Sequence, residues 1–151
     1  MDYEDDPVVL AEAARLHAEA KAHRHATLPP GRLPLDWGRS VEVAYPNLWP
    51  PYSCEVPAGW VDLILAFSTH AAALAPGLRV EDAKEKYGGL RLNLSVSDDD
   101  EMSWAYLDLG GVYEAMSVTV CQDCGEPGKL RDDRGWHATL CDRHEKNRDP
   151  M

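Results

Sequence analysis

The amino-acid sequence predicts an α+β fold in which helices pack on a small antiparallel sheet or hairpin, with a separate module at the C-terminal end. Three observations lead to this prediction. Residues 7–26 and 57–75 carry apolar side chains at three- and four-residue steps, a spacing typical of helices. Residues 90–96 alternate apolar and polar side chains, which indicates a strand with one buried face. Beyond residue 120, cysteine and histidine stand in two closely spaced pairs.

Length and composition fit one small folded protein. The chain has 151 residues, of which 44% are apolar and five are tryptophan, enough for a modest core. It begins MDYEDDPVV, which is acidic where a secretory signal would be basic and then apolar, and no run of about eighteen apolar residues occurs. We therefore expect a cytoplasmic protein that does not enter a membrane.

Residues 7–26 are rich in alanine and other strong helix formers. Asp6 can cap the helix, and Pro7 suits its first position. The apolar stripe is thin, because it consists of Val9, Ala13, Leu16 and Ala20. We expect this helix to pack at the edge of the core or against a partner.

Residues 27–59 contain seven prolines and cannot support long regular elements. A short strand is expected at residues 41–44, within an irregular segment that spans residues 27–56. That segment also holds several aromatic side chains, which a flexible linker would not need: Trp37, Tyr45, Trp49 and Tyr52. It is therefore expected to lie across the core as an ordered wrap.

Residues 57–75 form the best candidate for a core helix, with Pro57 at its start and Gly77 just beyond its end. Its apolar positions recur at helical spacing and are Trp60, Leu63, Ile64, Phe67, Ala71 and Leu74. His70 falls near this stripe. A histidine with a structural hydrogen bond is expected there, in preference to a metal ligand or a catalytic group.

A hairpin is predicted over residues 78–97, with its turn at Gly88 and Gly89. The acidic run at residues 98–101 then suits the start of a helix over residues 99–116, because negative charge favours a helix N-terminus. Gly110 and Gly111 interrupt that helix. They could end it, divide it or allow a close packing approach.

The two closely spaced pairs have the spacing of a tetrahedral zinc site, with C-x2-C and C-x2-H separated by a loop. The predicted ligands are Cys121, Cys124, Cys141 and His144. Two disulfides would be the alternative, but the paired spacing and the missing secretory signal oppose them. A strand at residues 118–120, a further strand, a turn and a last strand then complete a zinc ribbon over residues 118–146. The predicted organisation is thus an acidic region over residues 1–120, the ribbon, and a tail at residues 147–151.

Three thiolates and a neutral imidazole fill all four zinc positions, which favours a structural over a catalytic metal. No catalytic residue is therefore assigned. His137 and Asp142 lie near the ligands in sequence and could support them or replace one of them. Cys54 stands apart from the other cysteines and is expected to be a small buried side chain.

A zinc deaminase is the enzymatic alternative, because His17 and Glu19 form an H-x-E string and Cys121 with Cys124 forms C-x-x-C. Val120 stands where that signature has proline, and Cys141 with His144 would have no role. Walker, G-x-S-x-G, G-x-G-x-x-G and H-E-x-x-H motifs do not occur. The carboxylates of residues 98–101 could bind a hard cation, although a solvated helix start is favoured.

Four sequence blocks together resemble an uncharacterised group of small bacterial and phage-encoded proteins. The blocks are Gly59-Trp60, KEKYGGLRL at residues 84–92, CQDCGEPG at residues 121–128 and GWHATLCDRH at residues 135–144. Members of the group resemble this chain in placing an EK-(F/Y)-GGLR block before a terminal CxxCG and LCxxH or LCxxC ribbon. The resemblance spans residues 59–144 and implies the hairpin and the ribbon but no activity. The charged hairpin tip could contact a partner, although plain solvation is favoured.

Charge is distributed unevenly along the chain. Residues 1–120 carry 19 acidic and 9 basic side chains, whereas residues 121–151 carry 7 and 6. Such a surface repels nucleic acid and attracts basic partners. We therefore expect a non-enzymatic zinc-binding protein that binds a protein with a basic surface, as an adaptor, an inhibitor or an immunity-type protein in a phage- or defence-related role. Nucleic-acid binding through the ribbon is the alternative, and its basic residues are Lys129, Arg131, Arg134, Arg143, Lys146 and Arg148.

Overall fold

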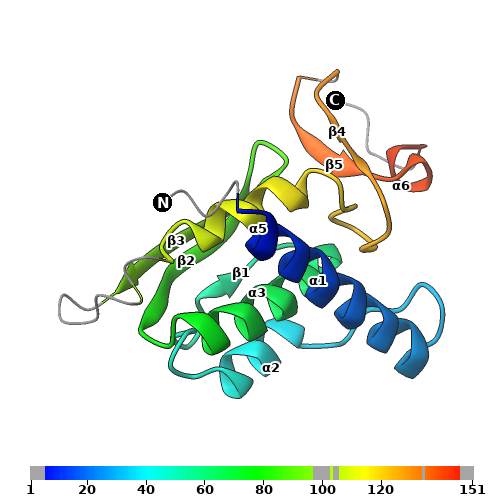
Figure 1. The fold of residues 1–151 in the computed structure, drawn as a ribbon. Helices are drawn as coiled ribbons and strands as arrows, with labels where there is room; N and C mark the ends of the chain where they lie inside the picture. Colours follow the sequence, from blue (N-terminus) through cyan, green and yellow to red (C-terminus); the bar gives the residue numbers. More distant parts are fainter. Residues whose placement is uncertain (1–5, 97–102, 104–105, 134, 147–151) are drawn as a thin grey trace.

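A computed structural model describes residues 6–96, 103, 106–133 and 135–146. The chain is α+β, as predicted (Figure 1). The helices are α1 (Pro7–Thr27), α2 (Trp37–Ala44), α3 (Val61–Leu74), α5 (Leu109–Ser117) and α6 (Asp142–Lys146), with a 3-10 turn, η2, at Ala58–Trp60. The strands are β1 (Cys54–Glu55), β2 (Leu78–Lys86), β3 (Gly89–Val96), β4 (Lys129–Arg131) and β5 (Ala138–Leu140). Within this part of the chain, no helix is long and apolar enough to cross a membrane.

The larger sheet has the strand order β1-β2-β3 and confirms the predicted hairpin. Strands β2 and β3 pair antiparallel from Leu78 opposite Val96 to Lys86 opposite Gly89, and the short β1 adds a parallel edge. The turn lies one residue earlier than expected. Its central residues are Tyr87 and Gly88, with φ of 54° and 82°, the left-handed pair that a two-residue hairpin loop requires.

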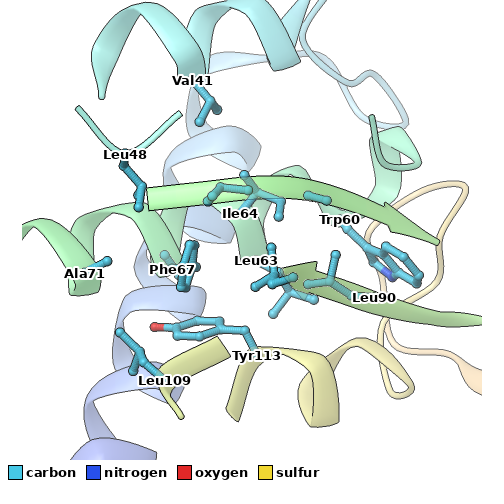
Figure 2. Packing of buried hydrophobic residues seen from close by; sticks show 14 of the residues in the cluster. Val41, Leu48, Trp60, Leu63, Ile64, Phe67, Ala71, Leu90, Leu109 and Tyr113 are labelled. Atoms are coloured by element: carbon cyan, nitrogen blue, oxygen red, sulfur yellow. The ribbon is translucent and has the colours of Figure 1, made fainter. Parts of the chain in front are cut away.

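The core forms around α3, which is the predicted core helix with its first turn wound as η2. Figure 2 shows its side chains meeting residues of the sheet, α5 and the segment around α2. Phe67 makes edge-to-face contacts with Trp49 and Tyr113, at centroid distances of 6.3 and 5.6 Å. At the other end of this core, Trp60 is fully buried and faces the segment that leads to β4.

Helix α1 confirms the helix predicted over residues 7–26, including the Asp6 cap, whose Oδ1 accepts the amide of Val8 at 2.8 Å. It lies along α3, and the thin apolar stripe buries Val9 and Ala13 against the core. A charged contact reinforces this packing near the C-terminal end of the helix. Arg24 is 6% exposed and pairs with Asp62 of α3, so α1 is joined to the core and is not a peripheral element.

The strand expected at residues 41–44 was wrong, because these residues belong to helix α2. Trp37 and Val41 are one helical turn apart and both face the core, while Val43 is 80% exposed. The buried carboxylate of Glu42 accepts the amides of Tyr52 and Cys54, at 2.9 and 3.1 Å. These bonds order the proline-rich wrap that follows the helix.

The second half of the helix predicted over residues 99–116 is confirmed as α5, and residues 106–108 before it form a turn. Helix α5 starts at Leu109, and most of the expected first half, including the carboxylates at 98–101, lies outside the described residues. Gly110 allows a close approach, because a Cβ there would lie 3.1 Å from Cδ1 of Leu94 in β3. The strand predicted at residues 118–120 was also wrong: Val118 and Thr119 form a turn, and Val120 makes a single bridge to Pro127.

Candidate metal centre

The four predicted ligands come together at the C-terminal end of the chain. One donor atom from each of Cys121, Cys124, Cys141 and His144 lies within 4.8 Å of the others, so the group could hold a metal ion. Sγ of Cys124 and Cys141 are 3.8 Å apart, and Nδ1 of His144 lies 3.6 and 3.1 Å from Sγ of Cys121 and Cys141. Zinc bond lengths of about 2.3 Å to sulfur and about 2.0 Å to nitrogen imply tetrahedral edges of about 3.8 and 3.5 Å. The Cys124–Cys141 and Cys121–His144 separations match these edges, whereas the Cys141–His144 separation of 3.1 Å is shorter.

A tight turn presents the first two ligands. The amide of Gly125 donates to the carbonyl of Cys121 at 2.9 Å, and the amide of Cys121 donates to the carbonyl of Glu126 at 2.8 Å. Gly125 has φ of +81°, in the left-handed region that glycine adopts without strain. A C-x-x-C-G sequence thus closes on itself and turns both sulfurs to one side.

The second ligand pair comes from a strand end and a short helix. Cys141 follows β5 directly, and α6 begins at the next residue, with the amide of Glu145 donating to the carbonyl of Cys141 at 3.0 Å. Cys141 and His144 are three residues apart, so the helical turn places them on the same side. The predicted hairpin of the ribbon is present as β4 and β5, whereas a helix start takes the place of the second turn. Residues 118–146 are called the metal module below.

Electrostatics favour a cation among these donors. Burial, together with the adjacent sulfurs of Cys121 and Cys141, raises the pKa of the Cys124 thiol to about 12. Against the opposing effect of burial, the backbone amide and side chain of His144 lower the pKa of Cys141 to about 7. Thiolates this close repel one another, and a bound cation removes that repulsion by binding them in the deprotonated form.

The turn of the metal module docks on the start of the core helix. The amide of Gly59 donates to the carbonyl of Gln122 at 2.9 Å, and Nε1 of Trp60 donates to the carbonyl of Val120 at 2.9 Å. Gly59 leaves no room for a side chain, because a Cβ would lie 2.3 Å from the carbonyl oxygen of Cys121. The Gly59-Trp60 pair therefore supports the first ligand from behind.

The β2–β3 hairpin tip docks on strand β5. Thr139 is fully buried, and its hydroxyl donates to the carbonyl of Gly88 at 2.6 Å. A Cβ on Gly88 would lie 3.1 Å from the backbone nitrogen of Ala138. The ring of Tyr87 also contacts that of His137, at a centroid distance of 6.0 Å. The KEKYGGLR block thus contacts the metal module of its own chain at Gly88, while Tyr87 is 67% exposed.

The metal module makes its third contact with the C-terminal end of α1. Three basic side chains of this helix lie near Glu126, which follows Cys124 in the turn that carries the first two ligands (the ligand turn below). Lys21 lies 3.3 Å from this carboxylate, His25 2.9 Å and Arg24 3.4 Å. Burial opposes ionisation of Glu126, but its hydrogen bond to His25 and the charge of Lys21 hold its pKa below the usual range. The metal module therefore touches α1, the start of α3 and the hairpin tip.

Other residues singled out in the sequence are not among the four clustered donors. Asp142 is exposed and pairs with Arg131 at 2.9 Å, so its pKa is lowered. Cys54 is 5% exposed, and burial raises its pKa to about 12, which fits the expected small buried side chain. His70 is 2% exposed, and its Nδ1 lies 2.9 Å from the hydroxyl of Tyr113. Burial lowers the pKa of His70.

The two residues of the deaminase string lie on α1. Glu19 pairs with Arg15 at the surface, at 2.6 Å. His17 is half-buried, and burial lowers its pKa. Neither residue is among the donors that the described part of the chain gathers around the candidate metal position.

Sequence reasoning missed the residues that dock the metal module: Gly59 and Thr139 as close contacts, and Glu126 as an ion-pair partner. Gly59 is part of the resemblance, but its role needs the position of Gln122, more than sixty residues away. No local pattern signals the Thr139 contact. The cluster of Lys21, Arg24 and His25 near the end of α1 was a usable signal, since it called for an acidic partner.

Comparison with known proteins adds no relative. No protein-family model, curated protein or solved structure matches the chain.

Proposed function

We propose that this chain is a non-enzymatic zinc-binding protein that acts by binding a macromolecular partner, as an adaptor, an inhibitor or an immunity-type protein. The observation that carries the proposal is the set of four protein donors within 4.8 Å of one another, on a module that touches three separate elements. A metal held this way organises the fold. Its four positions leave none for a water or a substrate.

Zinc is the ion that this donor set favours. Three thiolates with one imidazole match the structural zinc sites of proteins, whereas magnesium and calcium prefer oxygen donors. Two donor separations, Cys124–Cys141 and Cys121–His144, agree with zinc bond lengths. Zinc would bind here without redox chemistry of its own.

The partner that charge favours is a protein with a basic surface. The chain carries a formal net charge of −11, almost all of it within residues 1–120. A single-sign field of this kind speeds association with an oppositely charged surface and opposes binding to phosphates. A nuclease, a toxin or a nucleic-acid-processing complex would present such a basic surface.

Affinity capture from host lysate, followed by measurement of the dissociation constant against salt, tests this proposal. We expect a specific protein partner whose affinity falls as ionic strength rises, because salt screens exposed charges. Asp108→Lys reverses one exposed acidic charge and should weaken binding by an amount that shrinks at high salt. Lys129→Glu is the matched control, because it replaces one exposed basic charge on the metal module with an acidic charge. Absence of any saturable partner at low salt would contradict the proposal.

Nucleic-acid binding through the metal module is the second candidate, supported by the exposed side chains of Lys129, Arg143 and Lys146. Arg131 is less available, because it pairs with Asp142 and donates to the carbonyl of Leu140 at 3.1 Å. Arg134 and Arg148 lie outside the described residues. A mobility-shift assay at low salt that shows a complex with the wild type, and a weaker one with Lys129→Glu, would favour this candidate.

A further inference from the structure

A cleft of about 490 Å³ separates the C-terminal end of α1 and the segment after it from the metal centre. Its apolar wall contains Pro29 and Pro30, and its other wall contains Cys124, Cys141 and Arg143. Two of the four donors therefore line an open space. Cys121 does not line the cleft and is 0% exposed, with Gly59 packed against its carbonyl group.

We propose that Cys124 and Cys141 form a site of reversible oxidation by small peroxides, which closes a disulfide between them and expels the metal ion. The inference rests on the proposed metal centre and adds a modification that controls it. A molecule as small as hydrogen peroxide fits the cleft and reaches both sulfurs. The two Sγ atoms are already 3.8 Å apart, so bond formation needs a short movement of the ligand turn.

The reaction balances with one peroxide for each pair. The thiolate of Cys124 or Cys141 attacks one peroxide oxygen, the O–O bond breaks, and a sulfenic acid forms as hydroxide leaves. The second thiolate attacks that sulfur, the S–S bond forms, and a second hydroxide leaves. Two electrons pass from the sulfurs to the peroxide, and the buffer protonates both hydroxides to water. Only Cys121 and His144 would then remain to hold a metal ion, which would dissociate.

Two features of the cleft favour these sulfurs over the other cysteines. Arg143 and Arg24 line the cleft, and their positive charge favours the hydroxide that leaves in each step. Cys54 provides a contrast within the same chain, because it is only 5% exposed and does not line the cleft. Oxidation is therefore expected at two of the four cysteines.

Disulfide formation would also release the end of α1. Glu126 lies two residues from Cys124, in the same tight turn, and pairs with Lys21, Arg24 and His25. A turn drawn towards Cys141 and stripped of its metal cannot keep this carboxylate in place. The modification would thus loosen the contact between the metal module and α1.

The test treats the zinc-loaded protein with hydrogen peroxide, follows zinc release with a chromogenic chelator and maps disulfides by peptide mass spectrometry. We expect one zinc released for each Cys124–Cys141 disulfide, while Cys121 and Cys54 stay as thiols. A disulfide that includes Cys121, zinc release without a disulfide, or no reaction would each overturn the inference. Zinc content is measured before peroxide is added, so a protein purified without zinc would count against the proposed metal centre and not against this step.

Charge variants test the cleft itself. Arg143→Ala should slow peroxide-driven zinc release severalfold, whereas Lys146→Ala, exposed on the same helix but outside the cleft, should leave the rate unchanged. Equal rates in both variants would contradict the role of the cleft.

Hydrogen exchange supplies a second readout: amides of residues 21–27 should exchange faster after oxidation and recover after dithiothreitol and zinc are added. Exchange that does not change there would contradict the release of α1.

Discussion

Gly59 lies where the backbone of the core and the backbone of the metal module meet. A Cβ at this position would be 2.3 Å from the carbonyl oxygen of Cys121 and 2.4 Å from the carbonyl carbon of Gln122. Neither atom is the end of a flexible side chain, so the clash can be relieved only if the module moves. The metal centre therefore depends on a single residue, Gly59, which has no side chain and lies about sixty residues before the first ligands.

Gly59→Ala should lower the free energy of unfolding by about 2 kcal/mol, within the range measured for overpacked interiors, and should weaken metal binding. Gly89→Ala is the matched control, because a Cβ there would meet its nearest atoms at an ordinary 3.6 Å. Urea unfolding and metal content measure both effects. Equal stability of the two variants would show that the module does not dock through Gly59.

Arg24 holds α1 in place through charge. Its guanidinium is buried between Asp62 and the ligand turn. Arg24→Met should cost about 3–5 kcal/mol, because it leaves the buried carboxylate of Asp62 without its partner. Arg15→Met on the same helix breaks exposed pairs with Glu12 and Glu19 and should cost far less, because water screens such pairs. Chemical unfolding of both variants is the measurement. A cost as small as that of Arg15→Met would mean that the buried pair does not fix α1.

Helices and strands differ in how well the sequence predicts them. Residues 7–26 and 57–75 have caps and helical periodicity, and the hairpin has alternation with a glycine turn, so local patterns sufficed. Helix α2 was missed because Val41 and Val43 flank a glutamate and resemble a strand. What decides between the two is tertiary: Trp37 and Val41 are buried on one side, and Glu42 binds amides of the segment that follows.

The four ligands could be predicted from the sequence, whereas the docking of the metal module could not. Ligand spacing is a local property, and two turns of fixed length must bring four donors together. The contacts of Thr139 with Gly88 and of Glu126 with α1 join residues 51 and 102 positions apart. Nothing in a local pattern encodes such pairs, because they depend on how whole elements pack.

Metal removal should act on several elements at once. After chelation, amides of β4, β5 and α6 should exchange rapidly, because the binding energy of the ion is folding energy for a module this small. Residues 21–27 of α1 and the tip at residues 87–88 should lose protection as well, whereas the middle of α3 should keep it. Hydrogen exchange with and without chelator measures this. Unchanged protection of β4 and β5 would contradict a structural role for the metal.

The whole molecule is expected to lose stability on mild acidification. Burial lowers the pKa of His17 and His70 below the usual 6.5, so below that pH the unfolded chain binds more protons than the folded chain. The free energy of unfolding should therefore fall as pH drops from 6.5 to the lowered pKa values. The slope from one fully buried histidine approaches about 1.4 kcal/mol per pH unit.

His70→Phe isolates the contribution of His70 to this pH dependence. It removes one of the two histidines whose pKa is lowered by burial and leaves the metal ligands in place. Stability measured against pH for the variant and the wild type should show a shallower decline in the variant below pH 6.5. The comparison cancels the pH dependence of metal binding, which both proteins share. Parallel curves would mean that protonation of His70 does not oppose folding.

At the scale of the whole chain, one ion is proposed to join α1, the core helix and the hairpin through a single module. X-ray absorption at the zinc edge of the purified protein tests this most directly, because it reports the metal and its donors together. We predict one zinc per chain, with three sulfur neighbours at about 2.3 Å and one nitrogen neighbour at about 2.0 Å. A protein that binds no zinc, or a shell with oxygen in place of sulfur, would contradict the account.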